Sequence, residues 1–196
     1  MRIIAGEARG RKLTAPRDDS IRPLLDRIRE SLFSTLEGSF EERRVLDLFA
    51  GVGSFGLEAL SRGARRAVFV DKEPSSLAIL QRNIETLGFA PRADVIRGDA
   101  LKAPALDSVK PPGFALAFLD PPFRMFDRER DAAMIFQRVR AILESQALEQ
   151  DGIVLLRHPS RFRGAIPIEV AGSKAYGESV VLRFERGAPG AGGPPA

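Results

Sequence analysis

The stretch VLDLFAGVGSFG, residues 45–56, decides the fold that this sequence predicts. Its apolar first half is typical of a buried strand, and its glycine-rich second half predicts a tight turn that leads into a helix at 54–61. A second apolar run at 67–70 ends on Asp71, which lies 20 residues after Gly51. A strand, a glycine turn, a helix and a second strand ending on a carboxylate together predict a parallel-sheet unit that binds a nucleoside-containing ligand.

Strands and helices alternate beyond this unit as well. Repeated strand–helix–strand units favour an α/β fold, in which a parallel sheet carries helices on both faces. The run at 114–119 has almost no polar residue, as expected of a strand covered on both faces. The expected strands are 45–50, 67–70, 94–97, 114–119 and 152–156, and the expected helices are 54–61, 128–143 and one that opens at Pro74 and ends at Gly88.

The two ends of the chain have patterns of their own. Three elements are expected there: a hairpin within residues 1–16, a helix from Asp26 (its N-cap) to Leu36, and an antiparallel hairpin that pairs 167–170 with 179–184. Residues 187–196 contain only Gly, Pro and Ala, so this tail is expected to be disordered. The chain is therefore divided into an N-terminal basic arm (1–25), a main α/β domain (26–186) and a tail (187–196).

Composition excludes several classes of protein. The chain has 196 residues, 44% of them apolar, which is enough for about one domain with its own core. Cysteine is absent and His158 is the single histidine, so thiolate-bound and histidine-rich metal sites are excluded and no metal is expected. No apolar run approaches the roughly 18 residues that cross a bilayer, and the polar start is unlike a secretory signal. A cytoplasmic protein that meets no membrane is expected.

Positive charge is concentrated near the N-terminus. Residues 1–29 contain eight Lys or Arg and four acidic residues, which equals the net charge of +4 of the whole chain. Because arginine forks suit phosphate, this segment predicts a polyanionic partner; the alternative is a merely solvated arm. The predicted phosphate-binding residues are Arg9, Arg11, Lys12 and Arg22. Arg157, Arg161 and Arg163 fit either an extension of that surface or a solvated face.

The position of Asp47 helps to identify the ligand, because this residue lies inside the first strand, four residues before Gly51. Beside a pyrophosphate its carboxylate would meet two negative charges, each costing about 4 kcal/mol at 4 Å and an effective dielectric of about 20. The ammonium and sulfonium of S-adenosylmethionine are favoured there instead. Asp71 is placed for ribose hydroxyls, and Asp99, after the third strand, for the adenine amine. The predicted cofactor contacts are Asp47, Phe49, Ala50, Gly51, Gly53, Asp71, Lys72, Asp99 and Ala100.

The tetrad Asp120-Pro-Pro-Phe123 follows the fourth strand, at the edge where such sheets hold their ligands. Two prolines make a stiff turn, so the Asp120 carboxylate and the Pro121 carbonyl can accept both hydrogens of one exocyclic NH₂ group. Phe123 can stack on the ring that carries this amine, which contributes about 1–3 kcal/mol per base. Two acceptors aim the nitrogen lone pair at the methyl group, and Asp120 takes the proton or passes it to water. Asp120, Pro121, Pro122 and Phe123 are the predicted catalytic residues; the alternative is a rigid loop.

These motifs resemble the RsmD family of bacterial 16S ribosomal RNA (guanine-N2)-methyltransferases. The similarity covers about residues 1–185, and its specific part is the N-terminal run, because many amino-methyltransferases share the glycine turn and the tetrad. It rests on residues 46–64 and 120–123, on Arg2-Ile-Ile-Ala-Gly6, Arg9-Gly-Arg-Lys-Leu13, Arg22-Pro23 and Asp26-Arg-Ile-Arg-Glu-Ser-Leu-Phe33, and on Lys174-Ala-Tyr-Gly177 before the last strand.

The resemblance implies the Rossmann-like, seven-stranded methyltransferase sheet with a small N-terminal β-hairpin extension. Residues 26–186 would form the methyltransferase domain, and residues 1–25 an RNA-binding arm. The donor would be S-adenosylmethionine, with S-adenosylhomocysteine as product. The acceptor would be a guanine N2 amine of 16S rRNA in the assembling or assembled small ribosomal subunit. A monomer is expected in preference to an oligomer.

Three other functions are left open by the residues themselves. An adenine-N6 methyltransferase acting on DNA or RNA would share the tetrad. A nicotinamide-dependent oxidoreductase would share the glycine turn, although Asp47 and the tetrad argue against it. A non-catalytic RNA-binding assembly factor would keep the sheet as a scaffold. In addition, Asp47 or Asp99 alone would fit a cap on a backbone group, and the glycines would fit tight packing of helix on strand.

Overall fold

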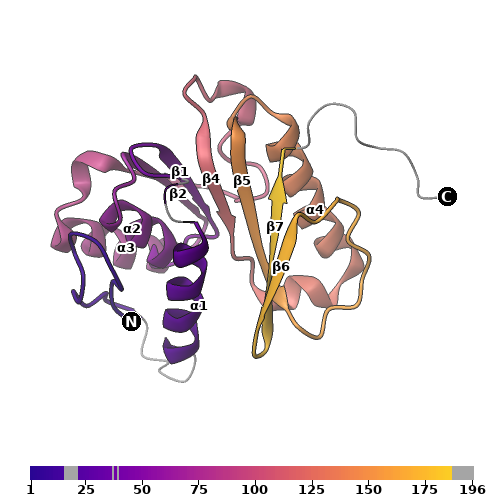
Figure 1. The fold of residues 1–196 in the computed structure, drawn as a ribbon, viewed down its shortest axis with the longest axis horizontal. Coiled ribbons are helices and arrows are strands. Elements are labelled where there is room, and N and C mark those ends of the chain that lie inside the picture. The colour runs from indigo at the N-terminus through magenta and orange to yellow at the C-terminus, as the bar shows by residue number, and fades with distance from the viewer. Residues whose placement is uncertain (16–21, 37, 39, 187–196) are drawn as a thin grey trace.

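A seven-stranded sheet in the order β3-β2-β1-β4-β5-β7-β6 forms the centre of the molecule (Figure 1). The computed structural model describes residues 1–15, 22–36, 38 and 40–186, with the backbone alone for 22–27. The strands are β1 (Arg44–Leu48), β2 (Arg66–Asp71), β3 (Ala93–Arg97), β4 (Phe114–Leu119), β5 (Leu148–Pro159), β6 (Gly172–Tyr176) and β7 (Ser179–Glu185). The helices are α1 (Arg22–Thr35), α2 (Ser54–Ser61), α3 (Pro74–Leu87) and α4 (Glu129–Glu144), with short 3-10 turns η1 (Ala90–Arg92), η2 (Leu106–Ser108) and η3 (Phe123–Asp127).

The strand register brings several loops to one edge of the sheet. Strands β1 to β5 run parallel, and β6 and β7 add to β5 as an antiparallel hairpin. Leu48 pairs with Val70 of β2 and with Leu119 of β4, so these three strands end at the same level. The chain order reverses between β1 and β4, and loops diverge at such a switch point to leave room for a ligand.

The two faces of the sheet carry separate hydrophobic cores. The N-terminal residues, α1, α2 and α3 cover one face, and α4 with the segment 100–109 covers the other. Figure 1 shows α1, α2 and α3 together on the left and α4 on the right. The α/β sheet with helices on both faces is therefore confirmed. Within the part of the chain that the structure describes, no helix is long and apolar enough to cross a membrane.

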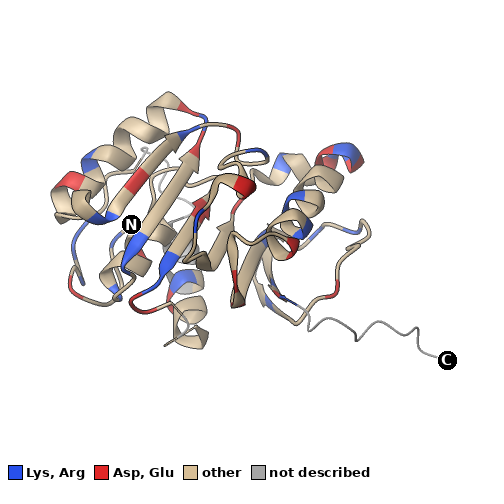
Figure 2. Ribbon diagram, turned by 90° about the horizontal axis from the view of Figure 1, so that it is seen from above, with Lys and Arg blue, Asp and Glu red and all other residues tan. Residues whose placement is uncertain are grey.

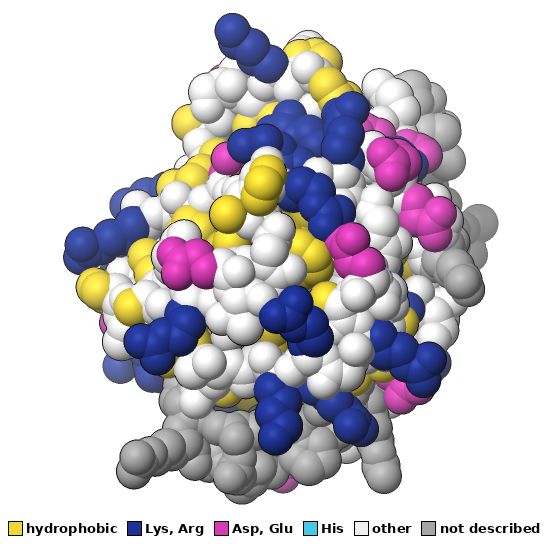
Figure 3. Space-filling view, turned by 90° about the vertical axis from the view of Figure 1, so that its left-hand side faces the viewer, with side chains coloured by type: hydrophobic (Ala, Val, Ile, Leu, Met, Phe, Trp, Pro, Cys, Tyr) yellow, Lys and Arg dark blue, Asp and Glu magenta, His cyan; other side chains and the backbone are white. Residues whose placement is uncertain are grey.

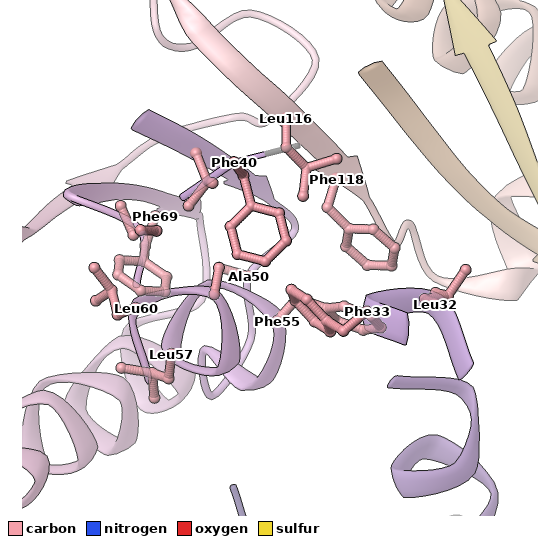
Figure 4. Close-up of a cluster of buried hydrophobic side chains, with 14 of the residues drawn as sticks. Leu32, Phe33, Phe40, Ala50, Phe55, Leu57, Leu60, Phe69, Leu116 and Phe118 are labelled. Atoms are coloured by element: carbon pink, nitrogen blue, oxygen red, sulfur yellow. The ribbon is translucent and has the colours of Figure 1, made fainter. Parts of the chain in front are cut away.

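Three phenylalanines link distant segments in the first core (Figure 4). The rings of Phe55 in α2 and Phe118 in β4 stack with centroids 3.6 Å apart, and Phe33 of α1 stacks on Phe55 at 6.4 Å. Aromatic pairs of this kind contribute about 0.5–1.5 kcal/mol beyond their buried area. The stack fixes the start of α2, and hence the glycine turn before it, against the strand that leads to Asp120.

The N-terminal segment forms a small hairpin and packs on α2 and α3. Arg2 and Lys12 make an antiparallel bridge, as the sequence predicts. The carboxylate of Glu58, with no exposed surface, accepts the backbone N–H groups of Ile4 at 2.8 Å and Ala5 at 3.1 Å. The guanidinium of Arg29, also fully buried, donates to the Arg2 carbonyl at 2.6 Å. These contacts join the first residues to the main domain.

Both predicted ends of helix α1 are wrong. Helix α1 begins at Arg22 rather than Asp26, so Asp26 lies inside the helix and is no N-cap. Pro23 explains the earlier start, because proline is tolerated in the first turn of a helix, where its missing N–H has no partner. The helix also ends at Thr35.

The first strand of the C-terminal hairpin lies at 172–176 rather than at 167–170. This edge strand is mostly exposed, so it lacks the apolar alternation from which strands are predicted. Gly177, with φ of 56°, makes the tight turn to β7. Strand β5 also extends well beyond the predicted 152–156. The expected disorder of 187–196 lies outside the described residues.

Candidate active site

A cleft of about 1800 Å³, including its open mouth, lies at the carboxyl edge of the sheet. The loops after β1, β2, β3 and β4 and the end of β5 contribute to it, which is the place that the switch point predicts. The predicted residues that line this cleft are Phe49, Gly51, Asp71, Lys72, Asp99, Ala100, Asp120, Pro121, Pro122 and Phe123. Glu73, Ser76, Leu101, Arg124, Met125, Arg157, Glu178 and Ser179 complete its lining.

The glycines of the turn after β1 have two different structural roles. Gly51 has φ of 56° and faces open space, because an added Cβ would find no atom nearer than 4.0 Å. Gly53 has φ of 84°, and its added Cβ would lie 2.3 Å from Cδ1 of Leu80. An added Cβ at Gly56 would meet the ring of Phe69 at the same distance. Gly51 therefore borders the cleft, whereas Gly53 and Gly56 allow α2 to pack closely.

The carboxylate of Asp71 joins the loop after β1 to the loop after β2. Its Oδ2 accepts the N–H of Gly51 at 2.7 Å, and its Oδ1 accepts the N–H of Glu73 at 2.9 Å. Asp99 has a similar local role, since its Oδ1 accepts the N–H of Leu101 at 3.0 Å. The remaining lone pairs of both carboxylates are the acceptors that this half of the cleft offers to ligand hydroxyl or amino groups.

Asp47 lies behind the glycine turn rather than on the wall of the cleft. Only 2% of the residue is exposed, and its Oδ2 accepts the N–H of Gly56 at 2.9 Å. Burial, opposed by this hydrogen bond, raises the pKa of Asp47 well above its usual value, and the charges of Asp120 and Asp71 add to the rise. Ala50 and Gly53 also lie outside the lining. Direct contact of these three residues with a cofactor stays a prediction.

The turn at Asp120 is held by main-chain hydrogen bonds and by one side chain that lies far away in the sequence. The N–H of Asp120 donates to the Leu48 carbonyl at 3.3 Å, and the Pro122 carbonyl accepts the N–H of Met125 at 2.9 Å as η3 begins. The Oδ1 of Asp120 accepts the Nε–H of Arg157 at 2.7 Å. Burial raises the pKa of Asp120, and the positive charge and hydrogen bond of Arg157 oppose that rise.

Arg157 is the cleft residue that sequence reasoning assigned wrongly. Its guanidinium carbon lies 4.8 Å from the centre of the Phe123 ring, and only 13% of its side chain is exposed. It is therefore neither a solvated residue nor part of an open basic surface. The available signal was its position, because it is the first charged residue after the apolar run Ile153–Leu156, at the end of a strand that borders the tetrad.

The basic residues of the N-terminal segment are exposed where they can be described. Arg9, Arg11 and Lys12 lie on the surface, and Arg11 also donates to the Thr86 carbonyl. The side chain of Arg22 lies outside the described residues. Figure 2 shows blue and red segments interspersed along the described elements, and Figure 3 shows Lys and Arg spread over one face, with Asp and Glu and uncharged surface between them. Phosphate binding by these residues stays a prediction.

The charge of the cleft tests which ligand it suits. Five acidic residues line it against three basic ones: Asp71, Glu73, Asp99, Asp120 and Glu178 against Lys72, Arg124 and Arg157. An excess of carboxylates favours a cationic ligand and disfavours a pyrophosphate at close range. The residues present therefore fit the ammonium and sulfonium of S-adenosylmethionine better than they fit a dinucleotide.

Similar solved structures share this architecture. The "Putative methyltransferase yhhF" of Escherichia coli superposes with a TM-score of 0.77 at 28% identity, covering 96% of this chain and 98% of that one. An RNA methyltransferase from Salinibacter ruber, in complex with S-adenosyl-L-homocysteine, has the same fold with a TM-score of 0.59 at 17% identity, covering 90% and 97%. The strand order places the chain in the class of proteins with the Rossmann-like fold of S-adenosylmethionine-dependent methyltransferases.

Sequence comparison narrows this class to one family. YlbH of Bacillus subtilis (strain 168) is 37% identical over 162 residues, covering 81% of this chain and 82% of YlbH. A relative from Haemophilus influenzae is 41% identical over 127 residues, covering 63% of this chain and 64% of that one. The family model described as "Conserved hypothetical protein 95" matches residues 1–185, and the chain belongs to this family of RsmD and YlbH proteins. The predicted resemblance is thus confirmed at the level of the family.

Proposed function

We propose that this protein transfers a methyl group from S-adenosylmethionine to the exocyclic N2 amine of a guanine in small-subunit ribosomal RNA. The observation that carries the proposal is the shared cleft. Asp71 and Asp99, the predicted donor contacts, line the same cavity as the Asp120-Pro-Pro-Phe123 turn. A methyl donor and a flat ring with an amine would therefore meet within one site.

The names of two relatives support ribosomal RNA as the substrate. YlbH is named "Putative rRNA methyltransferase YlbH", and the Haemophilus relative is named "Ribosomal RNA small subunit methyltransferase D". The exposed Arg9 and Lys12 would supply attraction to phosphate, which positions an RNA but does not read its bases. The choice of guanine would then come from the shape and acceptors of the cleft.

The residues of the turn would act on the target amine by holding and orienting it. A carboxylate oxygen of Asp120 and the Pro121 carbonyl accept the two N–H hydrogens, and Phe123 stacks on the ring. This arrangement draws the nitrogen toward tetrahedral geometry and points its lone pair into the cleft. Orientation of this kind contributes up to roughly 7–11 kcal/mol in favourable cases.

Methyl transfer then needs one proton acceptor. When bound, S-adenosylmethionine supplies the methyl group, and its carbon–sulfur electron pair stays with sulfur in S-adenosylhomocysteine. The nitrogen lone pair forms the new N–C bond, and the nitrogen becomes acidic as this bond forms. Asp120, or a water molecule that it holds, takes the released proton. A stacked target base must first be flipped into the cleft, at a cost of a few kcal/mol.

Nucleoside analysis tests this proposal. The purified protein is incubated with methyl-labelled S-adenosylmethionine and either 16S rRNA or small subunits from cells that lack the protein, with DNA as a parallel substrate. The RNA is then digested to nucleosides and examined by mass spectrometry. Labelled N2-methylguanosine is expected. Labelled N6-methyladenosine alone would support the adenine alternative, and tight NAD binding without S-adenosylmethionine binding would support an oxidoreductase.

A further inference from the structure

Arg157 already makes the contacts that the proposed function assigns to the target base. Its Nε–H donates to Asp120 Oδ1 at 2.7 Å, and its guanidinium lies over the Phe123 ring at 4.8 Å. Both partners belong to the catalytic turn. The exposed fractions of the Arg157 and Asp120 side chains are 13% and 20%, so the contact is sheltered within the cleft.

A guanidinium and the amine edge of guanine are chemically alike. Each is a flat carbon bonded to three nitrogens, and each presents neighbouring N–H groups to an acceptor. A carboxylate binds such an edge through charge-assisted or parallel hydrogen bonds, and an aromatic ring binds its face. The cleft therefore shows, with its own side chain, that Asp120 and Phe123 can hold a planar guanidino group.

We propose that Arg157 is an internal stand-in for the target base. Its side chain occupies the acceptor position, on Asp120 and Phe123, before RNA binds, and it is displaced when the guanine enters. This inference rests on the proposed function and names a residue that controls access to the site. Arg157 and the base compete for Asp120 and for the ring of Phe123. The observed binding free energy of guanine is therefore its intrinsic binding free energy at the acceptor position, reduced by the free energy needed to displace the Arg157 guanidinium.

The fold allows this exchange without moving the main chain. Arg157 lies in β5, where Leu156 pairs with Leu119 of β4 and Arg157 itself pairs with Val181 of β7, so the backbone is fixed from both sides. The long side chain can turn about its own bonds. Glu178, exposed in the turn before β7, lines the same cleft and offers the displaced guanidinium another anion, as would an RNA phosphate.

Binding of guanosine monophosphate to the protein saturated with S-adenosylhomocysteine is the direct test. The proteins compared are the wild type, Arg157→Met, Arg157→Lys and the control Arg183→Met. The control removes an arginine of β7, the strand next to β5, where Arg183 pairs with Glu185 of the same strand. Ligand-observed NMR titration is done at several pH values up to about 8.5, because burial raises the pKa of Asp120 and loss of the Arg157 charge removes the effect that opposes this rise. Arg157→Met should bind guanosine monophosphate about tenfold more tightly, because one charge-assisted competitor is gone. Arg157→Lys should lie between, and Arg183→Met should equal the wild type.

Equal or weaker binding by folded Arg157→Met overturns the proposal. It would then follow that Arg157 positions Asp120 during the reaction. Steady-state kinetics with RNA separate the two roles independently. If Arg157 is a stand-in, its removal lowers the KM for RNA by more than it changes kcat. If Arg157 is a positioning residue, its removal lowers kcat at nearly constant KM. Arg157→Lys keeps the question answerable if Arg157→Met does not fold.

The outcome also distinguishes this inference from the proposed function. If the wild type methylates no guanine but Arg157→Met still gains affinity for guanosine monophosphate, the proposed reaction is wrong and the stand-in is supported. If N2-methylguanosine is formed but removal of Arg157 brings no gain in affinity and no fall in KM, only the stand-in is wrong.

Discussion

The cleft has two halves that are built in different ways. The donor half, around Asp71 and Asp99, is where we propose that the methyl donor binds, and the acceptor half, around the turn at 120–123, is where we propose that the target base binds. In the donor half, carboxylates are held by backbone groups, since Asp71 accepts the N–H groups of Gly51 and Glu73 and Asp99 accepts that of Leu101. In the acceptor half, the carboxylate of Asp120 is held by the Arg157 side chain, 37 residues away. A main-chain partner cannot leave without unfolding the loop, whereas a side chain can rotate. The donor half is therefore preorganised, and the acceptor half can change when its ligand arrives.

Replacement of Asp120 should separate the halves most sharply. In Asp120→Ala the amine loses its side-chain acceptor, so kcat for methyl transfer should fall by about 10²–10⁴-fold, the usual contribution of a general base or proton acceptor. Binding of S-adenosylhomocysteine, measured by calorimetry, should change by less than about twofold. Asp120→Asn controls for the shape of the side chain. Unaltered methylation would show that Asp120 takes no part in the reaction, and weakened cofactor binding would show that the halves are not independent.

Replacement of Asp71 should have the opposite pattern. Asp71→Ala removes the acceptor of two loop N–H groups and the carboxylate predicted to bind ribose, so the Kd for S-adenosylhomocysteine should rise by about 10–100-fold. At saturating donor, kcat should fall far less than in Asp120→Ala. Calorimetry and kinetics on the same preparation check both numbers. A variant that loses kcat while its cofactor affinity is kept would contradict the assignment of Asp71 to the donor half.

Replacement of two glycines in the turn after β1 should have smaller effects, which differ between the two positions. Gly53→Ala should lower the free energy of unfolding by about 2–3 kcal/mol, because it combines a left-handed backbone with a contact on Leu80. Gly51→Ala meets only the backbone penalty, about 1 kcal/mol, because its surroundings are open. Urea unfolding of both variants measures the difference. Equal losses would show that helix packing does not depend on Gly53.

The same contrast explains what could be predicted from sequence. Helix α2 and strand β4 have the predicted bounds, and α3 begins at Pro74 and stops at Gly88, because these signals lie within a few residues of the structure they specify. The donor half depends on such local signals. The contact between Asp120 and Arg157 depends on strands paired across the sheet, and no local pattern encodes it.

Strand β6 was misplaced for a related reason. It is an exposed edge strand whose partner, β7, determines its position, so the burial pattern that marks other strands is missing. Asp47 shows a further limit. The sequence left open whether its carboxylate contacts the cofactor or caps a backbone group, and the structure shows it accepting the N–H of Gly56. The roles of the individual site residues stay predictions until the variants above are measured.

The docking of the N-terminal segment has a consequence for biosynthesis. Ala5 needs Glu58, Ala8 needs Ser61, and Thr14 needs Asn83, which follow 53 to 69 residues later. At about 5–20 residues per second of synthesis, these residues wait roughly 3–14 s for their partners to be made. The hairpin of residues 1–15 can therefore reach its final place only after α2 and α3 have been synthesised.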